Sequence, residues 1–162
     1  MLTFPNFEVR ESLLNHLLAS FSDNDVAEIQ PLYLQLLHYL EEKKIEKFQT
    51  TLHGLFARIP YQLHIKHEYY YHSLCYMILA LMGARIDLEV LSDKGRMDAV
   101  IELEKIIYII EFKMGTAEQA MQQIKKRKYF EPFLNRDKEV FLLAVGGFKA
   151  KIIRCLLEKA GN

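Results

Sequence analysis

The feature that most constrains this sequence is the apolar run 106–110, Ile-Ile-Tyr-Ile-Ile, which Glu111, Phe112 and Lys113 follow directly. A run this apolar predicts a strand in the core of a sheet, buried on both faces. Side chains alternate between the faces of a strand, so Glu111 and Lys113 share one face and Phe112 points to the other. An acid and a base are therefore expected side by side at the rim of the core.

A neighbouring strand is expected over residues 97–103, and it carries Asp98 near its start. Only a short connection separates it from the apolar strand, which predicts an adjacent, hairpin-like pair. Asp98 and Glu111 would then face each other across the pair. Two carboxylates this close repel, and the pKa of one rises unless a cation lies between them.

A hard cation such as Mg²⁺ fits this arrangement, because it binds through one or two carboxylates, water and a substrate phosphate. Such an ion can activate water and stabilise charge that develops at phosphorus. Lys113 would orient the attacking water or stabilise the charged transition state. The alternative is an ordinary ion pair between Glu111 and Lys113, with Asp98 as a turn residue. The spacing alone does not decide between a phosphodiester-hydrolysing site and this ion pair.

Composition sets wider limits on fold and function. The 162 residues, 51% of them hydrophobic, are enough for one compact domain with a core. The 21 basic and 21 acidic residues give zero formal charge, which argues against a protein that coats nucleic acid but not against an enzyme with one basic patch. No signal peptide and no apolar stretch long enough to span a membrane is visible, so a cytoplasmic protein is expected.

The order of expected elements indicates an α/β protein with a mixed sheet flanked by helices. The N-terminal segment, residues 1–62, reads as helical and is expected to pack on an α/β core formed by residues 63–162. Periodicity and breakers predict helices over residues 7–21, 26–42, 45–56, 64–82 and 116–133 and strands over residues 84–91, 97–103, 106–114, 140–145 and 151–156.

The motif Gly95-Arg96-Met97-Asp98, followed by Glu111-Phe112-Lys113 and flanked by two helices, resembles the PD-(D/E)XK nuclease superfamily. More narrowly, the chain resembles the nuclease domain that follows an AAA-ATPase-like domain in bacterial proteins. That narrower likeness rests on the stretches 5–10, 59–61 and 68–72. The resemblance implies a restriction-endonuclease-like fold and Mg²⁺- or Mn²⁺-dependent cleavage of DNA. Met97 departs from the superfamily name, which has proline at this position.

The resemblance also implies a role for each matching residue. Asp98 and Glu111 match the metal-binding acids, and Lys113 matches the catalytic lysine. Glu68 matches an acid on the preceding helix that lies near the metal and binds it directly or through water. Gln123, on the following helix, resembles a glutamine that completes such sites.

A basic run, Lys125-Lys126-Arg127-Lys128, lies on the same following helix. It predicts contacts with a phosphate backbone; the alternative is a solvated helix face. The residues taken as candidates for nucleic-acid binding are Lys125, Lys126, Lys128 and Tyr129, the last by resemblance.

Two functions remain open on the sequence. The first is a metal-dependent nuclease acting on DNA. The second is a module that retains the nuclease fold but is catalytically silent or needs a partner, such as an AAA-ATPase-like domain or protein. Glu89, on the strand before Asp98, is a further candidate for an outer carboxylate at the site, and the alternative is ordinary solvent-facing alternation.

Overall fold

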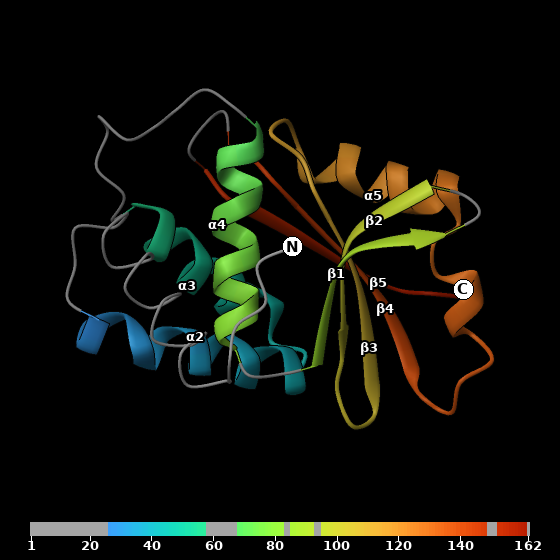
Figure 1. The fold of residues 1–162 in the computed structure, drawn as a ribbon, viewed down its shortest axis with the longest axis horizontal. Coiled ribbons are helices and arrows are strands. Elements are labelled where there is room, and N and C mark those ends of the chain that lie inside the picture. Colours follow the sequence, from blue (N-terminus) through green and yellow to red (C-terminus); the bar gives the residue numbers. More distant parts are fainter. Residues whose placement is uncertain (1–25, 58–67, 83–84, 93–94, 149–151, 162) are drawn as a thin grey trace, which may run out of the picture.

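The computed structural model describes residues 26–57, 68–82, 85–92, 95–148 and 152–161 (Figure 1). The elements in chain order are α2 (Val26–Glu41), α3 (Ile45–Ala57), α4 (Glu68–Leu81), β1 (Arg85–Ser92), β2 (Gly95–Glu102), β3 (Ile106–Phe112), α5 (Ala117–Arg127), the 3₁₀ helix η2 (Glu131–Phe133), β4 (Glu139–Gly146) and β5 (Arg154–Lys159). The helix expected over residues 7–21 lies outside the described residues.

Five strands of the described part form one sheet in the order β1-β2-β3-β4-β5. The pairs β1–β2, β2–β3 and β4–β5 are antiparallel, whereas β3 and β4 are parallel and α5 makes the crossover between them. The mixed α/β sheet expected from the sequence, with a restriction-endonuclease-like fold, is confirmed.

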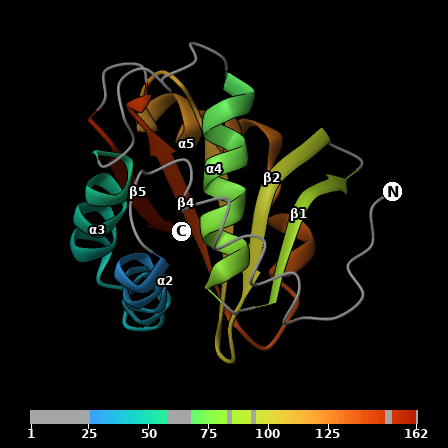
Figure 2. The ribbon, with the colours of Figure 1, turned by 60° about the vertical axis from the view of Figure 1, so that its left-hand side comes forward.

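Helices cover both faces of this sheet. Figures 1 and 2 show α2, α3 and α4 on one face and α5 on the other. On β3, Tyr108 and Ile110 enter the core beneath α4, whereas Ile107 and Ile109 enter the core beneath α5. Every residue of β3 is buried, which explains why its sequence is apolar without alternation.

The N-terminal helices share the larger of these two cores. Residues of α2 and α3 pack in the same cluster as α4 and the sheet, and the Tyr108 hydroxyl donates a 2.6 Å hydrogen bond to the Leu40 carbonyl. Each buried Leu or Phe of these helices contributes about 1.5–3 kcal/mol when it leaves water. The helical segment therefore packs tightly on the α/β core, and the expected boundary near residue 62 stays a prediction.

Several element ends differ from the sequence-based expectation, and two of these differences have a clear structural reason. Helix α5 ends at Arg127 because Lys128 adopts a left-handed conformation (φ 53°), and its N–H closes on the Lys125 carbonyl. β5 begins at Arg154, because the preceding Ile153 N–H donates to His53 Nδ1 of α3 and not to the sheet. The left-handed backbone at Lys128 sets the end of α5, and the contact with α3 sets the start of β5. The hydrophobic pattern of the sequence predicts neither.

The end of the β1–β2 hairpin, residues 89–92 and 95–98, is rotated relative to the main sheet, and we call it the arm. Leu88 and its partner Ala99 pack in the core beneath α4, but the next packed pair, Val90 and Met97, lies in the core beneath α5. Residues two apart normally share a face. Glu89 lies between them with a positive φ of 51°, and this left-handed residue marks the point where the hairpin turns over.

The close approach of α5 to β4 requires glycine at position 146. A Cβ on Gly146 would lie 2.3 Å from Thr116 C and 2.3 Å from Ala117 N, both backbone atoms. We expect Gly146→Ala to lower the free energy of unfolding by about 3 kcal/mol, measured by urea denaturation. Gly54→Ala in α3 is the matched control, because a Cβ there meets nothing within 4 Å; it should be neutral or stabilising by about 0.5–1 kcal/mol. Equal effects of the two changes would contradict this packing.

Candidate active site

The candidate site lies where β2 separates from β3. In an antiparallel pair, hydrogen-bonded positions recur at every second residue. Leu103 N–H donates to the Ile106 carbonyl, and the last paired residues are Ala99 and Ile110. Continued pairing would therefore join Phe112 N–H to the Met97 carbonyl.

The side chain of Asp98 replaces that missing backbone partner. Its Oδ2 accepts a hydrogen bond of 2.8 Å from Phe112 N–H. An N–H group buried without an acceptor is costly, so this contact stabilises the gap between the two strands. It also fixes Asp98 beside the end of β3, next to Glu111.

Glu111 is held by two polar neighbours from different elements. Gln123 of α5 donates from Nε2 to Oε1 of Glu111, and Lys113 Nζ lies 3.5 Å from the same oxygen. Oε2 of Glu111 is buried and has no hydrogen-bond partner among the described residues. Asp98 and Glu111 are only 7% and 1% exposed, the buried charged residues of the described part of the chain.

Burial shapes the protonation of both acids. The pKa of Glu111 is raised from 4.5 to about 8, first by desolvation and then by the Asp98 charge, against the lowering influence of Lys113 and Gln123. The pKa of Asp98 is also raised by burial, although the Phe112 N–H and nearby cationic groups oppose the shift. Two buried carboxylates with one unsatisfied oxygen constitute a site that a cation would stabilise.

One wall of the site comes from α4. The rings of His72 and Tyr76 lie 6.0 and 6.3 Å from the Phe112 ring, centroid to centroid. Burial and then the Asp98 charge raise the pKa of Tyr76, which keeps its hydroxyl protonated at neutral pH. These side chains cover the Phe112 ring on the α4 side of the sheet. Glu68, the first residue of α4, has a side chain outside the described part, so its predicted place near a metal stays a prediction.

Helical geometry separates the predicted basic residues on α5. Lys125 is two positions from Gln123 and so lies on the opposite side of the helix, where its Nζ pairs with Glu158 of β5 at 2.6 Å. Lys126 is three positions from Gln123 and is exposed on a side close to it. Lys128 pairs with the neighbouring Glu131 at 3.2 Å.

Tyr129 lies inside the molecule. Its side chain is 3% exposed and packs in the core beneath α5. A base could stack on this ring only if the ring left the core, so the structure gives Tyr129 a packing role and does not support the predicted contact with nucleic acid.

The predicted residue set omitted Arg96. It lies two residues before Asp98 on β2, is exposed, and its charge lowers the pKa of Asp98. On a regular strand, residues two apart share a face, so the spacing in Gly95-Arg96-Met97-Asp98 already contained a signal for Arg96.

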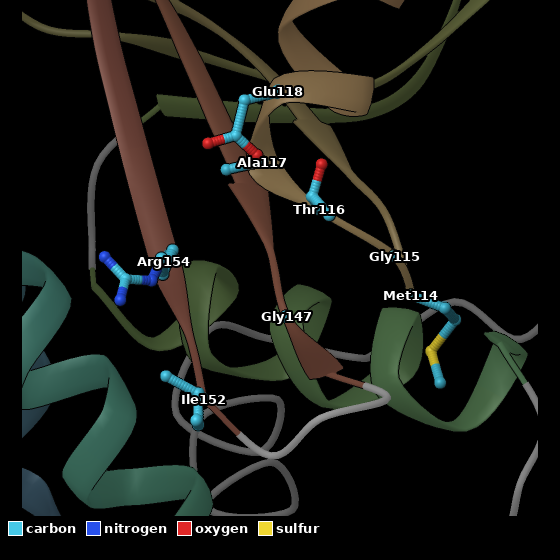
Figure 3. A pocket seen from close by; sticks show the side chains of 8 residues that line it. All are labelled: Met114, Gly115, Thr116, Ala117, Glu118, Gly147, Ile152 and Arg154. Atoms are coloured by element: carbon cyan, nitrogen blue, oxygen red, sulfur yellow. The ribbon is translucent and has the colours of Figure 1, made fainter.

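A cavity of about 600 Å³ opens directly after Lys113, at the start of α5 (Figure 3). It is lined by Met114, Gly115, Thr116, Ala117, Glu118, Gly147, Ile152 and Arg154. Thr116 caps α5 and exchanges hydrogen bonds with Gln119, so the helix start is already satisfied. Most of the lining is apolar, and neither Asp98 nor Glu111 is among the lining residues.

Groups of three or more His, Cys, Asp or Glu side chains that could enclose a metal are absent from the residues that the structure describes. A site of two carboxylates is compatible with a hard ion that keeps water ligands, and incompatible with a closed zinc cage. Within the same residues, no helix has both the length and the apolar character needed to cross a membrane.

Comparisons with known proteins agree with this geometry. A family model described as the PD-(D/E)XK nuclease superfamily matches residues 66–155, which include both acids, Lys113 and Gln123. A protein of Azotobacter chroococcum mcd 1, named "Uncharacterized protein in vnfD 5'region", is 30% identical over 152 residues, covering 89% of this chain and 29% of that protein. The chain thus spans less than a third of this relative. No solved structure matches the chain significantly.

The raised pKa of Glu111 predicts a pH-dependent stability in metal-free protein. The unfolded chain releases this proton near pH 4.5, whereas the folded protein keeps it until about pH 8. The folded state therefore binds more protons within this window, and its free energy of unfolding falls with rising pH, by at most about 1.4 kcal/mol per pH unit. Urea denaturation in EDTA between pH 5 and 8 measures the slope. Glu111→Gln cannot release the proton and should flatten it; parallel slopes for the two proteins would contradict the assignment.

Proposed function

Because the chain belongs to the PD-(D/E)XK nuclease superfamily, we propose that it is a divalent-metal-dependent nuclease that hydrolyses phosphodiester bonds of DNA. One observation carries the proposal: two buried carboxylates, Asp98 and Glu111, meet where β2 separates from β3, with Lys113 Nζ 3.5 Å from Glu111. A buried acid pair of this kind is unfavourable as a purely structural feature, so a role with a bound cation explains it better.

Asp98 and Glu111 would hold the metal, proposed to be Mg²⁺ or Mn²⁺. The unsatisfied Oε2 of Glu111 and the hard oxygen donors fit such an ion. When bound, the ion supplies Lewis-acid stabilisation of charge at phosphorus and lowers the pKa of water. Glu68 is a further proposed ligand, directly or through water.

Lys113 and Gln123 lie beside Glu111 and are proposed to assist the metal-binding acids. Lys113 is 29% exposed, so its ammonium group lies at the rim where substrate would arrive. There it can orient a water molecule or stabilise the extra negative charge of the transition state. The side-chain amide of Gln123 donates a hydrogen bond to Oε1 of Glu111. Oε2 has no hydrogen-bond partner among the described residues, so it is the oxygen proposed to bind the metal.

A second candidate function is a nucleic-acid-binding module that works only with a partner. The chain has zero formal charge, and Lys125 and Lys128 form ion pairs. The electrostatic attraction of the isolated chain to DNA is therefore small, which favours a module that needs a partner to bind DNA. The resemblance to domains that follow AAA-ATPase-like domains makes such a domain or protein the proposed partner. The two candidates differ in whether the isolated chain cleaves DNA.

Cleavage of supercoiled plasmid tests the nuclease directly. With Mg²⁺ or Mn²⁺ we expect nicked or linear product, and Lys113→Ala should reduce the rate by at least about 100-fold, the loss typical of a removed transition-state contact. Lys105→Ala, an exposed lysine in the turn before β3, at the end of that strand opposite Lys113, controls for loss of positive charge and should retain most activity. Equal rates for wild type and Lys113→Ala would refute the catalytic role.

Metal binding can be tested without activity. Mg²⁺ that binds the folded state alone raises its stability by about 2.7 kcal/mol at 100 times the dissociation constant. We expect thermal unfolding of the wild type to shift upward with Mg²⁺ and the shift to vanish in Asp98→Asn. Asp87→Asn, on the exposed face of β1, is the matched control and should respond like the wild type. A structural ion pair would show no such response in any of these proteins.

A further inference from the structure

The arm has two faces with opposite character. Its back face, formed by Val90, Met97 and Gly95, packs toward α5: Val90 and Met97 belong to the core beneath that helix. A Cβ on Gly95 would lie 3.3 Å from the Tyr129 hydroxyl and 3.9 Å from Arg127 Nη1. The arm is thus held against the end of α5 and is not a freely projecting loop.

The front face of the arm is exposed and continues from the acids. Leu91 and Arg96 are paired across the hairpin, and directly paired residues share a face. Arg96 also contacts Glu89, which lies level with Asp98, between the pairs Leu88–Ala99 and Val90–Met97. The front face therefore runs from the level of Asp98 to Arg96 and Leu91 over about 7 Å of strand.

Charge and exposure distinguish this face from an ordinary surface. Leu91 is 82% exposed, more than any other exposed large apolar residue of the described chain. Arg96 makes a loose pair with Glu89, 3.5 Å between Nη1 and Oε1, with both side chains more than half exposed. Exposed pairs of this kind contribute little, so the guanidinium can exchange Glu89 for a phosphate.

We propose that the front face of the arm binds the substrate strand beside the scissile phosphate, with Arg96 on the adjoining backbone phosphate and Leu91 against the sugar or base beyond it. The inference rests on the proposed function, because the acids define where the scissile phosphate lies. A guanidinium recognises phosphate through paired N–H donors, and apolar side chains of DNA-binding proteins contact or wedge bases.

Single exposed leucines are common and need no explanation on their own. Leu91 differs because three observations coincide: the hairpin leaves the sheet at Asp98, its back is packed, and its front places an apolar side chain beside a cation. Figure 2 shows β1 and β2 at the edge of the sheet away from α2 and α3, where a nucleic acid could reach both the arm and the acids.

Binding of a fluorescent DNA duplex to the Lys113→Ala chain, measured by anisotropy in Mg²⁺ over a range of KCl concentrations, tests the inference. Adding Arg96→Ala should weaken binding about tenfold and reduce the slope of log K against log salt by about 0.9, because one phosphate contact is lost. Arg96→Lys should keep the slope. Leu91→Ala should weaken binding about fivefold without changing the slope, since an apolar contact releases no counterion.

The matched controls are Arg85→Ala, an exposed arginine at the other end of β1, and Leu134→Ala, an exposed leucine after η2. Both should bind like the parent chain. Losses at Arg96 and Leu91 no larger than those of the controls would overturn the inference, even if the wild type cleaves DNA. Losses at the arm without any cleavage by the wild type would support binding of a DNA strand by the arm and reject the nuclease activity. Failure of the parent chain to bind duplex DNA would also overturn the inference, whereas the nuclease activity is decided by the plasmid-cleavage test.

Discussion

The whole structure depends on the burial of β3 from both sides. Helices on one face and α5 on the other remove every residue of this strand from water, and that includes Glu111 at its end. A carboxylate in this position cannot satisfy both oxygens from the protein, and its pKa rises. The packing that stabilises the domain therefore also buries a carboxylate that a nearby positive charge would stabilise.

The second acid reaches the site by a break in regular structure. Where β2 leaves β3, the backbone can no longer pair, and Asp98 accepts the Phe112 N–H in place of a main-chain carbonyl. The left-handed Glu89 turns the hairpin over at the same level, which is the kind of local strain that clusters at functional sites. The end of the β2–β3 pairing, the position of Asp98 and the rotation of the arm therefore all occur at the same level of the hairpin.

Much of this arrangement follows from local sequence. The apolar run before Glu111 predicted the doubly buried strand, and alternation placed Lys113 beside that acid, as the structure shows. The rotation of the arm could not be predicted, because a positive φ at a glutamate has no sequence signal. Burial of Tyr129 was missed for a related reason: the helix ends at Arg127, Lys128 adopts a left-handed conformation, and the chain then turns inward. Tertiary packing decides such positions, not propensity.

The hydrogen bond from the Phe112 N–H makes the two carboxylate oxygens of Asp98 inequivalent. Oδ2 accepts the backbone N–H, which leaves both lone pairs of Oδ1 and the second lone pair of Oδ2 for other partners. An asparagine at this position could keep the backbone contact and present an N–H to Glu111, replacing repulsion by a donor. The metal-free fold would gain stability while the cation would lose a ligand. Selection for stability alone would thus favour asparagine at position 98 over the aspartate that the proposed metal site requires.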